Sequence, residues 1–303
     1  MKNSIPALLV LLMLFLSSCG GGGKKNSNFV FPEADSLPMA EVENLSDEAI
    51  EDIVQNISSP VEVAALLQSL QVPYFGDMLA STEAAKGLST SFEQALRLGI
   101  YGADLGYLNI YEKTGTSIEN LTTINELADG IRVGQFFDFE TLKRLAINKN
   151  NLDSLLFMSV DSYNRIDDYL RENNRGYLSA LMITGVWLEA QYLICKVVKD
   201  YPHEEIRNRI GEQKIVLNDL MLLLSPYKES SEEYANLYKD FERIKDVYRD
   251  VEITFTPGEP ETVEEDGRLV VVQVEESVVT MTDSQLEDII ILIDEIRNKL
   301  TSN

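Results

Sequence analysis

The sequence predicts a mostly α-helical fold, an antiparallel multi-helix bundle with a small β-hairpin or meander before the C-terminal helix. Two patterns support this prediction. From about residue 46 to residue 250, apolar residues recur three and four positions apart, the period of an amphipathic helix, and the connections are short. Short connections place successive helices antiparallel. Between residues 251 and 281 the apolar period changes to two, which is typical of strands.

The N-terminal residues have the pattern of an export signal. Lys2 is followed by an apolar run, Ile5 to Leu16, which is shorter than the roughly 20 residues that span a bilayer. The run suits a signal-peptide core. It ends in Leu-Ser-Ser-Cys at residues 16–19, which resembles the lipobox of bacterial lipoproteins. We therefore expect residues 1–18 to be a lipoprotein signal peptide and Cys19 to be the lipidation site.

Residues 19–44 read as a lipid-anchored flexible tether, because four glycines follow Cys19 and the segment shows little apolar periodicity. Lys24 and Lys25 are expected to hold the tether near anionic lipid. Gly20, rather than an aspartate, after the lipidated cysteine resembles an outer-membrane sorting signal. No acidic run of the kind that resembles a surface-export signal follows Cys19, so we expect an outer-membrane anchor and a domain that faces the periplasm.

One domain is expected from residue 45 to residue 303. Ser46 reads as an N-cap, Pro60 as a first helical residue, and Thr282 as the cap of the last helix. The run from Tyr177 to about Asp200 is apolar all round, which is typical of a central helix. The expected helices span about residues 46–57, 60–71, 91–111, 116–129, 136–147, 152–172, 177–200, 204–224, 234–250 and 283–300.

A β insertion is expected at residues 251–281. Val251–Phe255 alternates as a strand does, and Pro257-Gly258 is expected to end that strand. Asp266-Gly267 is typical of a hairpin turn. The further strand segments expected are Arg268–Val274 and Ser277–Met281.

Charge balance and rare residue types exclude several classes of function. The 303 residues include 26 Lys and Arg against 50 Asp and Glu, a net charge of -24, which opposes nucleic-acid binding. The single histidine, His203, excludes metal sites built on a histidine pair, so neither metal nor cofactor is expected. Cys195, the only cysteine besides Cys19, lies among apolar residues and reads as a small buried side chain.

The sequence contains no recognisable catalytic motif, so the chain is not expected to be an enzyme. It has no Gly-x-Ser-x-Gly sequence and no phosphate-binding glycine loop before a lysine and a serine or threonine. His203 follows Tyr201-Pro202 at the start of a helix, where a surface or capping role is favoured over that of a catalytic base.

The helix expected over residues 91–111 is the most informative. Gly99, Gly102 and Gly106 lie three or four positions apart, and each costs up to about 1 kcal/mol relative to alanine inside a helix. Close approach of another helix, such as the one that carries Gly185, is favoured as the explanation. Room for a ligand is the alternative.

Asp104 lies in this helix with Tyr101, Tyr107 and Tyr111 on its face. A buried carboxylate must be paired or hydrogen-bonded. A structural network of Asp104 with the tyrosine hydroxyls or with Arg97 is therefore favoured over a catalytic acid.

Trp187 and Glu189 belong to the most apolar run of the chain after the signal peptide. If Glu189 faces Asp104, the two carboxylates form the kind of pair that glycosidases use. Trp187 and the tyrosines of the 91–111 helix mark an interhelical cleft that suits a small molecule or a glycan.

Four stretches resemble an uncharacterised family of lipoproteins from Bacteroidota. The resemblance covers most of residues 45–300 and implies lipid anchoring and a helical fold, without an activity or a catalytic residue. The stretches are Ser58-Ser59-Pro60 with Pro73-Tyr74, LGIYGADLGYLNIY at residues 98–111, residues 151–172 with NLDSLL and SYNRIDDYLRE, and the hairpin with the last helix.

These observations favour a non-catalytic envelope lipoprotein that binds another protein or acts as a scaffold. Residues 33–52 carry eight acids and no base, and residues 259–276 carry seven acids and one base, so a basic partner is one reading of the charge. A small-molecule or glycan binder with a tyrosine-lined cleft is the second hypothesis. A carboxylate-dependent hydrolase is the third.

Overall fold

The computed structural model describes residues 60–147, 152–265 and 268–302. The chain divides into two compact units, residues 1–33 and 34–303, and every described residue belongs to the second. The expected signal peptide, the lipidation site Cys19, the tether and the helix expected over residues 46–57 lie outside the described residues.

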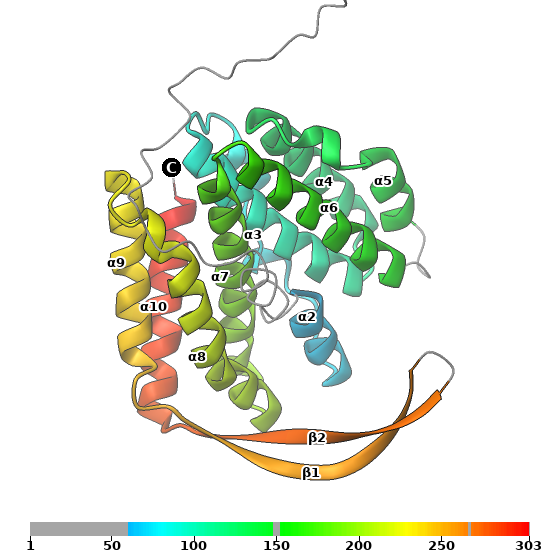
Figure 1. Ribbon diagram of the computed structural model, residues 1–303, viewed down its shortest axis with the longest axis vertical. Coiled ribbons are helices and arrows are strands. Elements are labelled where there is room, and N and C mark those ends of the chain that lie inside the picture. Colours follow the sequence, from blue (N-terminus) through cyan, green and yellow to red (C-terminus); the bar gives the residue numbers. More distant parts are fainter. Residues whose placement is uncertain (1–59, 148–151, 266–267, 303) are drawn as a thin grey trace, which may run out of the picture. The chain divides into compact units, whose positions relative to one another are not determined.

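Helices make up most of the described chain, and a two-stranded antiparallel sheet precedes the last of them (Figure 1). The predicted fold class is confirmed. The helices are α2 (Pro60–Ser69), α3 (Ser91–Ile110), α4 (Thr114–Gly130), α5 (Phe139–Ile147), α6 (Leu152–Glu172), α7 (Gly176–Asp200), α8 (Glu204–Leu224), α9 (Glu232–Val247) and α10 (Asp283–Thr301). The strands are β1 (Glu252–Glu265) and β2 (Arg268–Thr280), and the short 3-10 turns are η2 (Gly76–Met78), η3 (Thr82–Ala85), η4 (Gly134–Phe136) and η5 (Ser225–Tyr227).

Capping decides where several helices begin. Thr90 closes a capping box with Glu93 ahead of α3, and the predicted cap Thr282 does the same with Gln285 ahead of α10. The segment expected to be one helix over 136–147 divides into η4 and α5, since α5 begins only at Phe139.

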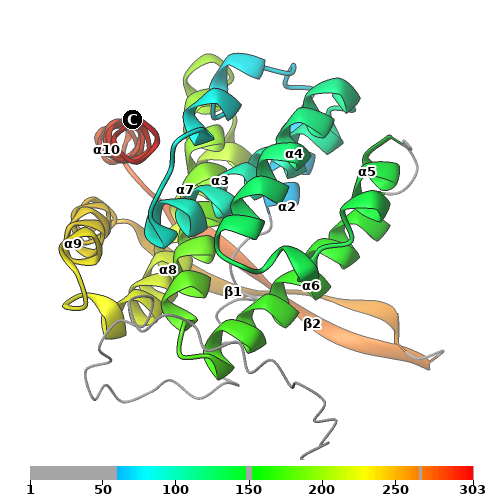
Figure 2. The same cartoon turned by 90° about the horizontal axis from the view of Figure 1, so that it is seen from above.

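Two helices form the centre of the bundle. Figure 2 shows α3 and α7 between α9 and α10 on one side and α4, α5 and α6 on the other. α7 is long and apolar enough to cross a membrane, yet its apolar window is 94% buried within the protein. It is therefore the core helix that its all-round apolar sequence predicts.

Glycines allow α3 and α7 to cross at close range. A Cβ atom on Gly99 would lie 1.9 Å from the carbonyl oxygen of Met182, and one on Gly185 would lie 2.1 Å from that of Leu96. Nothing lies within 4 Å of a Cβ atom added at Gly102. The predicted contact between the glycine helix and the Gly185 helix is confirmed, and only Gly99 of these two α3 glycines is required for it.

The hairpin is longer and more continuous than predicted. β1 runs through Pro257 and on to Glu265, and the break between Pro257 and Pro260 is a register shift within the ladder. The prediction that Pro257-Gly258 ends the strand is therefore wrong. A strand with an open edge tolerates proline, because a missing N–H there removes no ladder bond.

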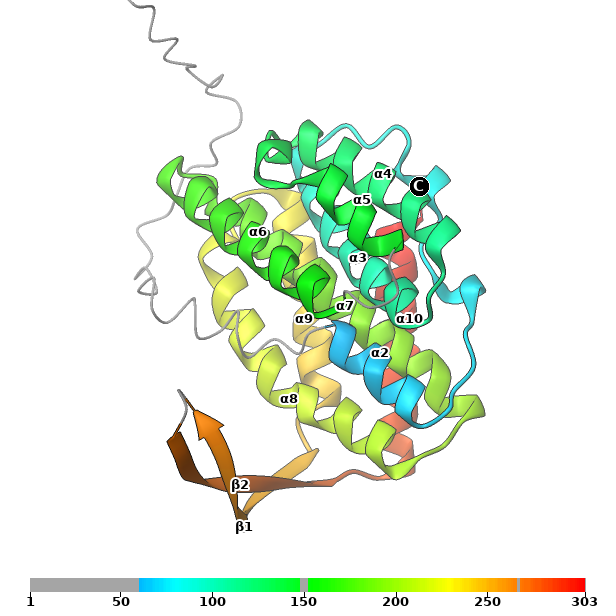
Figure 3. The same ribbon diagram turned by 90° about the vertical axis from the view of Figure 1, so that its right-hand side faces the viewer.

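The hairpin contacts the helices at its base, where β2 packs on α8. A Cβ atom on Gly211 of α8 would lie 2.4 Å from Cγ1 of Val279, so the glycine allows the strand to approach. Ser277 donates a short hydrogen bond to Glu212. Figure 3 shows the rest of the hairpin standing off the helical elements.

Candidate functional site

The polar face of α3 holds the segment that connects α2 to α3. We call residues 72–81 the α2–α3 segment. Three side chains of α3 and that of Tyr111, the C-cap of α3, each make one hydrogen bond to the backbone of the α2–α3 segment, and they are spaced three or four residues apart. The bonds are Tyr101 Oη to Ser81 O (2.6 Å), Ala80 N to Asp104 Oδ2 (3.0 Å), Phe75 N to Tyr107 Oη (3.0 Å) and Tyr111 Oη to Val72 O (2.9 Å).

The α2–α3 segment adds ring contacts to these bonds. Tyr74 stacks on Tyr107 with ring centroids 5.6 Å apart, and the ammonium of Lys113 lies 4.5 Å from the Tyr74 ring centroid. Tyr101 and Tyr107 are fully buried, and burial raises the pKa of each hydroxyl to about 12. The tyrosine face that suggested a ligand cleft is therefore covered by the chain's own backbone.

A buried ion pair lies beside this face. The guanidinium of Arg297 on α10 binds both carboxylate oxygens of Glu189 on α7, at 2.9 Å and 2.7 Å. It also donates to the Met78 carbonyl at 3.3 Å and stacks 4.2 Å from the Tyr192 ring centroid. Bidentate geometry and further hydrogen bonds, here from the guanidinium to the Met78 carbonyl, are what a buried ion pair needs to offset desolvation.

Asp104 is the second buried carboxylate of this cluster. Burial raises its pKa well above the ordinary value of 3.8, and the charge of Glu189 raises it further. Oδ2 accepts the Ala80 N–H, whereas Oδ1 has no hydrogen-bond partner. The N–H donor to Asp104 is thus a backbone amide, and its neighbouring side chain is that of Glu189, where a tyrosine hydroxyl or Arg97 was expected.

Arg97 contributes positive charge from α3. It is 2% exposed, and burial lowers its pKa. Its Nη1 atom has no hydrogen-bond partner. Two carboxylates and two guanidiniums therefore meet between α3, α7 and α10, and we call Arg97, Asp104, Glu189 and Arg297 the buried charge cluster.

The buried charge cluster brings Asp104 and Glu189 together, as the hydrolase hypothesis requires. Both carboxylates are 0% exposed, and Glu189 is held by Arg297. A glycosidase pair instead flanks a bound sugar and needs room for substrate between the carboxyl groups. The geometry thus favours a structural role for both acids.

Trp187 lies apart from the tyrosine face. Its Nε1 donates to Gln213 on α8 at 2.9 Å, and its ring packs 5.7 Å from Phe241 on α9. It is 1% exposed, so it belongs to the α7–α8–α9 core. Tyr101, Tyr107 and Trp187 are each at most 1% exposed, so these described side chains do not line the open cleft that was expected to combine them.

Two other sequence predictions are confirmed. Nδ1 of His203 accepts the Glu205 N–H at 3.3 Å, which makes this histidine the N-cap of α8. Cys195 is buried and carries no disulfide, and burial raises the pKa of its thiol far above the ordinary value.

Sequence reasoning missed Arg297, which neutralises Glu189. Arg297 stands seven and four residues after Ile290 and Ile293, on the apolar face of α10. A single arginine on the apolar face of one helix and a single glutamate, Glu189, in the apolar run of α7 are opposite charges in buried positions. That combination could have predicted a buried ion pair.

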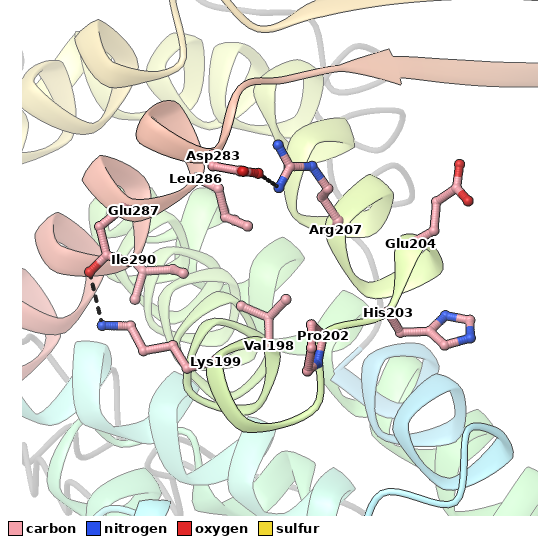
Figure 4. Close-up of a pocket in the computed structure, with 10 residues that line it drawn as sticks. All are labelled: Val198, Lys199, Pro202, His203, Glu204, Arg207, Asp283, Leu286, Glu287 and Ile290. Atoms are coloured by element: carbon pink, nitrogen blue, oxygen red, sulfur yellow. Dashed lines mark hydrogen bonds and ion pairs between the residues drawn. The ribbon is translucent and has the colours of Figure 1, made fainter.

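The pocket drawn in Figure 4 lies at the surface between the end of α7 and the starts of α8 and α10. Its volume is about 430 Å³, within the range of ligand pockets. The apolar lining is aliphatic, from Val198, Pro202, Leu286 and Ile290. Lys199 binds Glu287 at 3.2 Å and Arg207 binds Asp283 at 2.8 Å at the rim.

Among the described residues, no group of three or more His, Cys, Asp and Glu side chains is placed to hold a metal ion. Comparison of the chain with family models, with curated proteins and with solved structures finds no match in any of the three. Function must therefore be argued from the geometry alone.

Proposed function

We propose that this chain is a lipid-anchored, non-catalytic domain of the cell envelope that binds another protein or acts as a scaffold. The observation that carries the proposal is the contrast between the α3 polar face and the hairpin. The α3 hydroxyls and Asp104 are all bonded to the α2–α3 segment. Among the described residues, by contrast, no further strand pairs with either edge of the hairpin.

A two-stranded ribbon is marginally stable unless something packs on it. β1 and β2 have 14 and 13 residues, and within the described residues no third strand joins them. The outer edge of a two-stranded ribbon has unpaired N–H and C=O groups and pairs readily with another strand, as in recognition by β-strand addition. We therefore assign protein binding to the hairpin.

The test is to shorten the hairpin. Replacing Pro257–Glu275 by Asn-Gly joins Thr256 to Glu276, which already face each other in the ladder, and keeps the base on α8. Photo-crosslinking from a residue such as Thr262 in intact membranes should yield defined adducts with the parent chain. The shortened chain, with the crosslinker moved to Thr254, should lose them. Equal adducts from both chains would refute protein binding by the hairpin.

Anchoring and location are part of the proposal and need their own test. Cys19→Ala should release the chain from membranes and abolish labelling by a clickable fatty-acid analogue. Protease added to intact cells should leave the parent chain undigested, since the domain is proposed to face the periplasm from the outer membrane. Labelling that persists in Cys19→Ala rules out lipidation at this residue.

Small-molecule binding is a second candidate function, favoured by the pocket of Figure 4. Its aliphatic lining between opposite charges suits a small zwitterion with a branched aliphatic part, and no Phe, Tyr or Trp side chain, on which sugars commonly stack, is among its lining residues. His203 lines the pocket and is the single histidine, so its ring signals report on binding. A saturable shift with leucine, lost in Ile290→Asp, supports this candidate, and an unmoved signal excludes leucine-type ligands.

A further inference from the structure

The two edges of the hairpin differ in their capacity to accept another strand. β1 contains Pro257 and Pro260, which lack an N–H, together with the register shift between them and four glutamates from residue 259 to residue 265. Proline, irregular register and charge are the features that protect natural edge strands from pairing. The outer edge of β1 is therefore blocked.

The outer edge of β2 contains no proline, and its charged residues, Arg268, Glu275 and Glu276, flank an uncharged segment. Residues 269–274 read Leu-Val-Val-Val-Gln-Val, without proline, glycine or charge, and the ladder to β1 is regular from Arg268 to Gln273, with the register shift opposite Val274. Such a segment has high β-propensity and no net charge, so an unpaired edge at this place is a site of strand addition. Whatever pairs with the hairpin is expected to pair along β2.

The sequence of β2 complements itself when read in the opposite direction. Positions two apart along a strand belong to the same face of the sheet, and positions 268, 270, 272, 274 and 276 of β2 are Arg, Val, Val, Val and Glu. The order along this face is one base, three valines and one acid. An antiparallel copy centred on Val272 places Arg268 opposite Glu276 at both ends and valine opposite valine between them.

We infer that the partner of the β2 edge is a second copy of this chain. Two hairpins join through β2 around a two-fold axis at Val272 and form a four-stranded sheet in the order β1, β2, β2, β1. The register is allowed, since antiparallel neighbours pair residues of the same face. This inference rests on the proposed function, because it names the partner of the same hairpin.

The blocked edge of β1 makes the assembly a closed pair. Each copy has one open edge, and pairing uses it, so no edge remains for a third copy. The glutamates at residues 259–265 lie on the outer strands of the four-stranded sheet, away from the seam. Strand pairing over nine residues buries less surface than a standard interface, so the dimer is weak in solution and depends on the membrane to concentrate the chain.

Cysteine crosslinking in membranes tests the register. Val272→Cys in the full-length chain places the new thiol opposite its own copy, within reach of a disulfide, and should give dimers at least about tenfold faster than Val270→Cys. Val270 is the matched control, because it shares the strand and face of Val272 but lies opposite Val274 of the copy. The parent chain measures any background from Cys19 and the buried Cys195.

A charge swap tests the end pairs in the Val272→Cys background. Arg268→Glu should reduce dimer formation about tenfold, and Arg268→Glu with Glu276→Arg should restore it. Within one hairpin, Arg268 lies opposite Glu265, and Glu276 lies opposite Thr256. The double variant therefore still places a glutamate at position 268 opposite Glu265 within one hairpin, and it restores opposite charges only between positions 268 and 276 of the two copies.

The results separate this inference from the proposed function. Fast dimers from Val272→Cys, slow ones from Val270→Cys and rescue by the charge swap establish the two-fold strand pair. Equal rates for the two cysteine variants, no rescue, or a ladder of higher oligomers overturn it. If the hairpin photo-crosslinks to a different protein while Val272→Cys stays monomeric, the inference fails and protein binding stands.

Discussion

Between α3 and α7, the tyrosine hydroxyls, Asp104 and Glu189 are hydrogen-bonded to other parts of the chain, whereas no third strand pairs with β2 among the described residues. The α3 tyrosines and Asp104 each bind backbone of the α2–α3 segment, and Glu189 is held by Arg297. The two-stranded hairpin has no third strand among the described residues. The first region is expected to contribute to the stability of the fold, and the second is the part of the chain for which we propose binding.

The largest effect should come from the helix crossing. Gly99→Ala should abolish folding or cost at least about 4 kcal/mol, because its Cβ would lie 1.9 Å from the Met182 carbonyl oxygen and the helices must separate. Gly102→Ala is the matched control on the same helix. It should leave stability unchanged or raise it by up to about 1 kcal/mol. Urea unfolding of both variants decides, and equal losses would contradict the close crossing.

The buried charge cluster should come next. Arg297→Met should cost about 3–5 kcal/mol, because it leaves the Glu189 carboxylate buried without its partner. Arg297→Met with Glu189→Met removes both charges and should recover most of that loss. Thermal or urea unfolding measures both, and a double variant no more stable than the single one would show that burial of an unpaired charge is not the cause.

Two substitutions at Asp104 should separate the effect of its hydrogen bond from the effect of its charge. Asp104→Leu should cost about 1–3 kcal/mol, because the Ala80 N–H loses its acceptor inside the protein. Asp104→Asn keeps an acceptor for that N–H and has no charge to bury, so it should be at least as stable as the parent at pH 8. A lower unfolding free energy for Asp104→Asn than for Asp104→Leu would exclude this role.

The pH dependence of Asp104 follows from the direction of its pKa shift. Since its folded pKa is raised above 3.8, the folded chain keeps this proton where the unfolded chain has lost it. The contribution of this bound proton to the free energy of unfolding is fully present below the pKa of Asp104 in the unfolded chain. It is lost as the pH rises through the pKa of Asp104 in the folded chain. Unfolding free energy should therefore fall with rising pH more steeply in the parent than in Asp104→Asn.

The smallest effect on stability should come from the hairpin. Replacing Pro257–Glu275 by Asn-Gly should change the free energy of unfolding by no more than about 0.5 kcal/mol, because the base on α8 with Ser277 and Val279 is kept. Calorimetry of the shortened and parent chains measures this. A larger loss would show that the hairpin supports the bundle and would weaken the contrast between the two regions.

The helices could be predicted from local sequence because their signals are local. Apolar spacing, Pro60 and the Thr282 cap place α2 and α10 close to where the structure has them. The small residues of α3 and Gly185 of α7 also predict a close crossing, since glycine inside a helix is costly unless another backbone needs the space. Asp104 and Glu189 stand out for the same kind of reason, as charges in apolar helices.

The partners of these residues could not be predicted in the same way. The α3 tyrosines indicate a polar face, but only the tertiary structure shows that the α2–α3 segment covers it. The strand beyond Pro257 was missed because local rules treat proline as a strand end, whereas the ladder to β2 continues across it.

By itself, the sequence determined which segments are helices, where the two central helices can approach, and that two carboxylates needed partners in the core. The helices depend on residues a few positions apart. The close approach and the carboxylates are indicated by residue types, glycine in a helix and acids in an apolar run, that destabilise a fold unless a neighbouring backbone or a hydrogen-bonding partner compensates. Tertiary structure alone decided that Arg297, more than a hundred residues from Glu189, neutralises it, and that the tyrosine face is filled. Such pairings depend on how distant elements pack, and that depends on the whole chain at once.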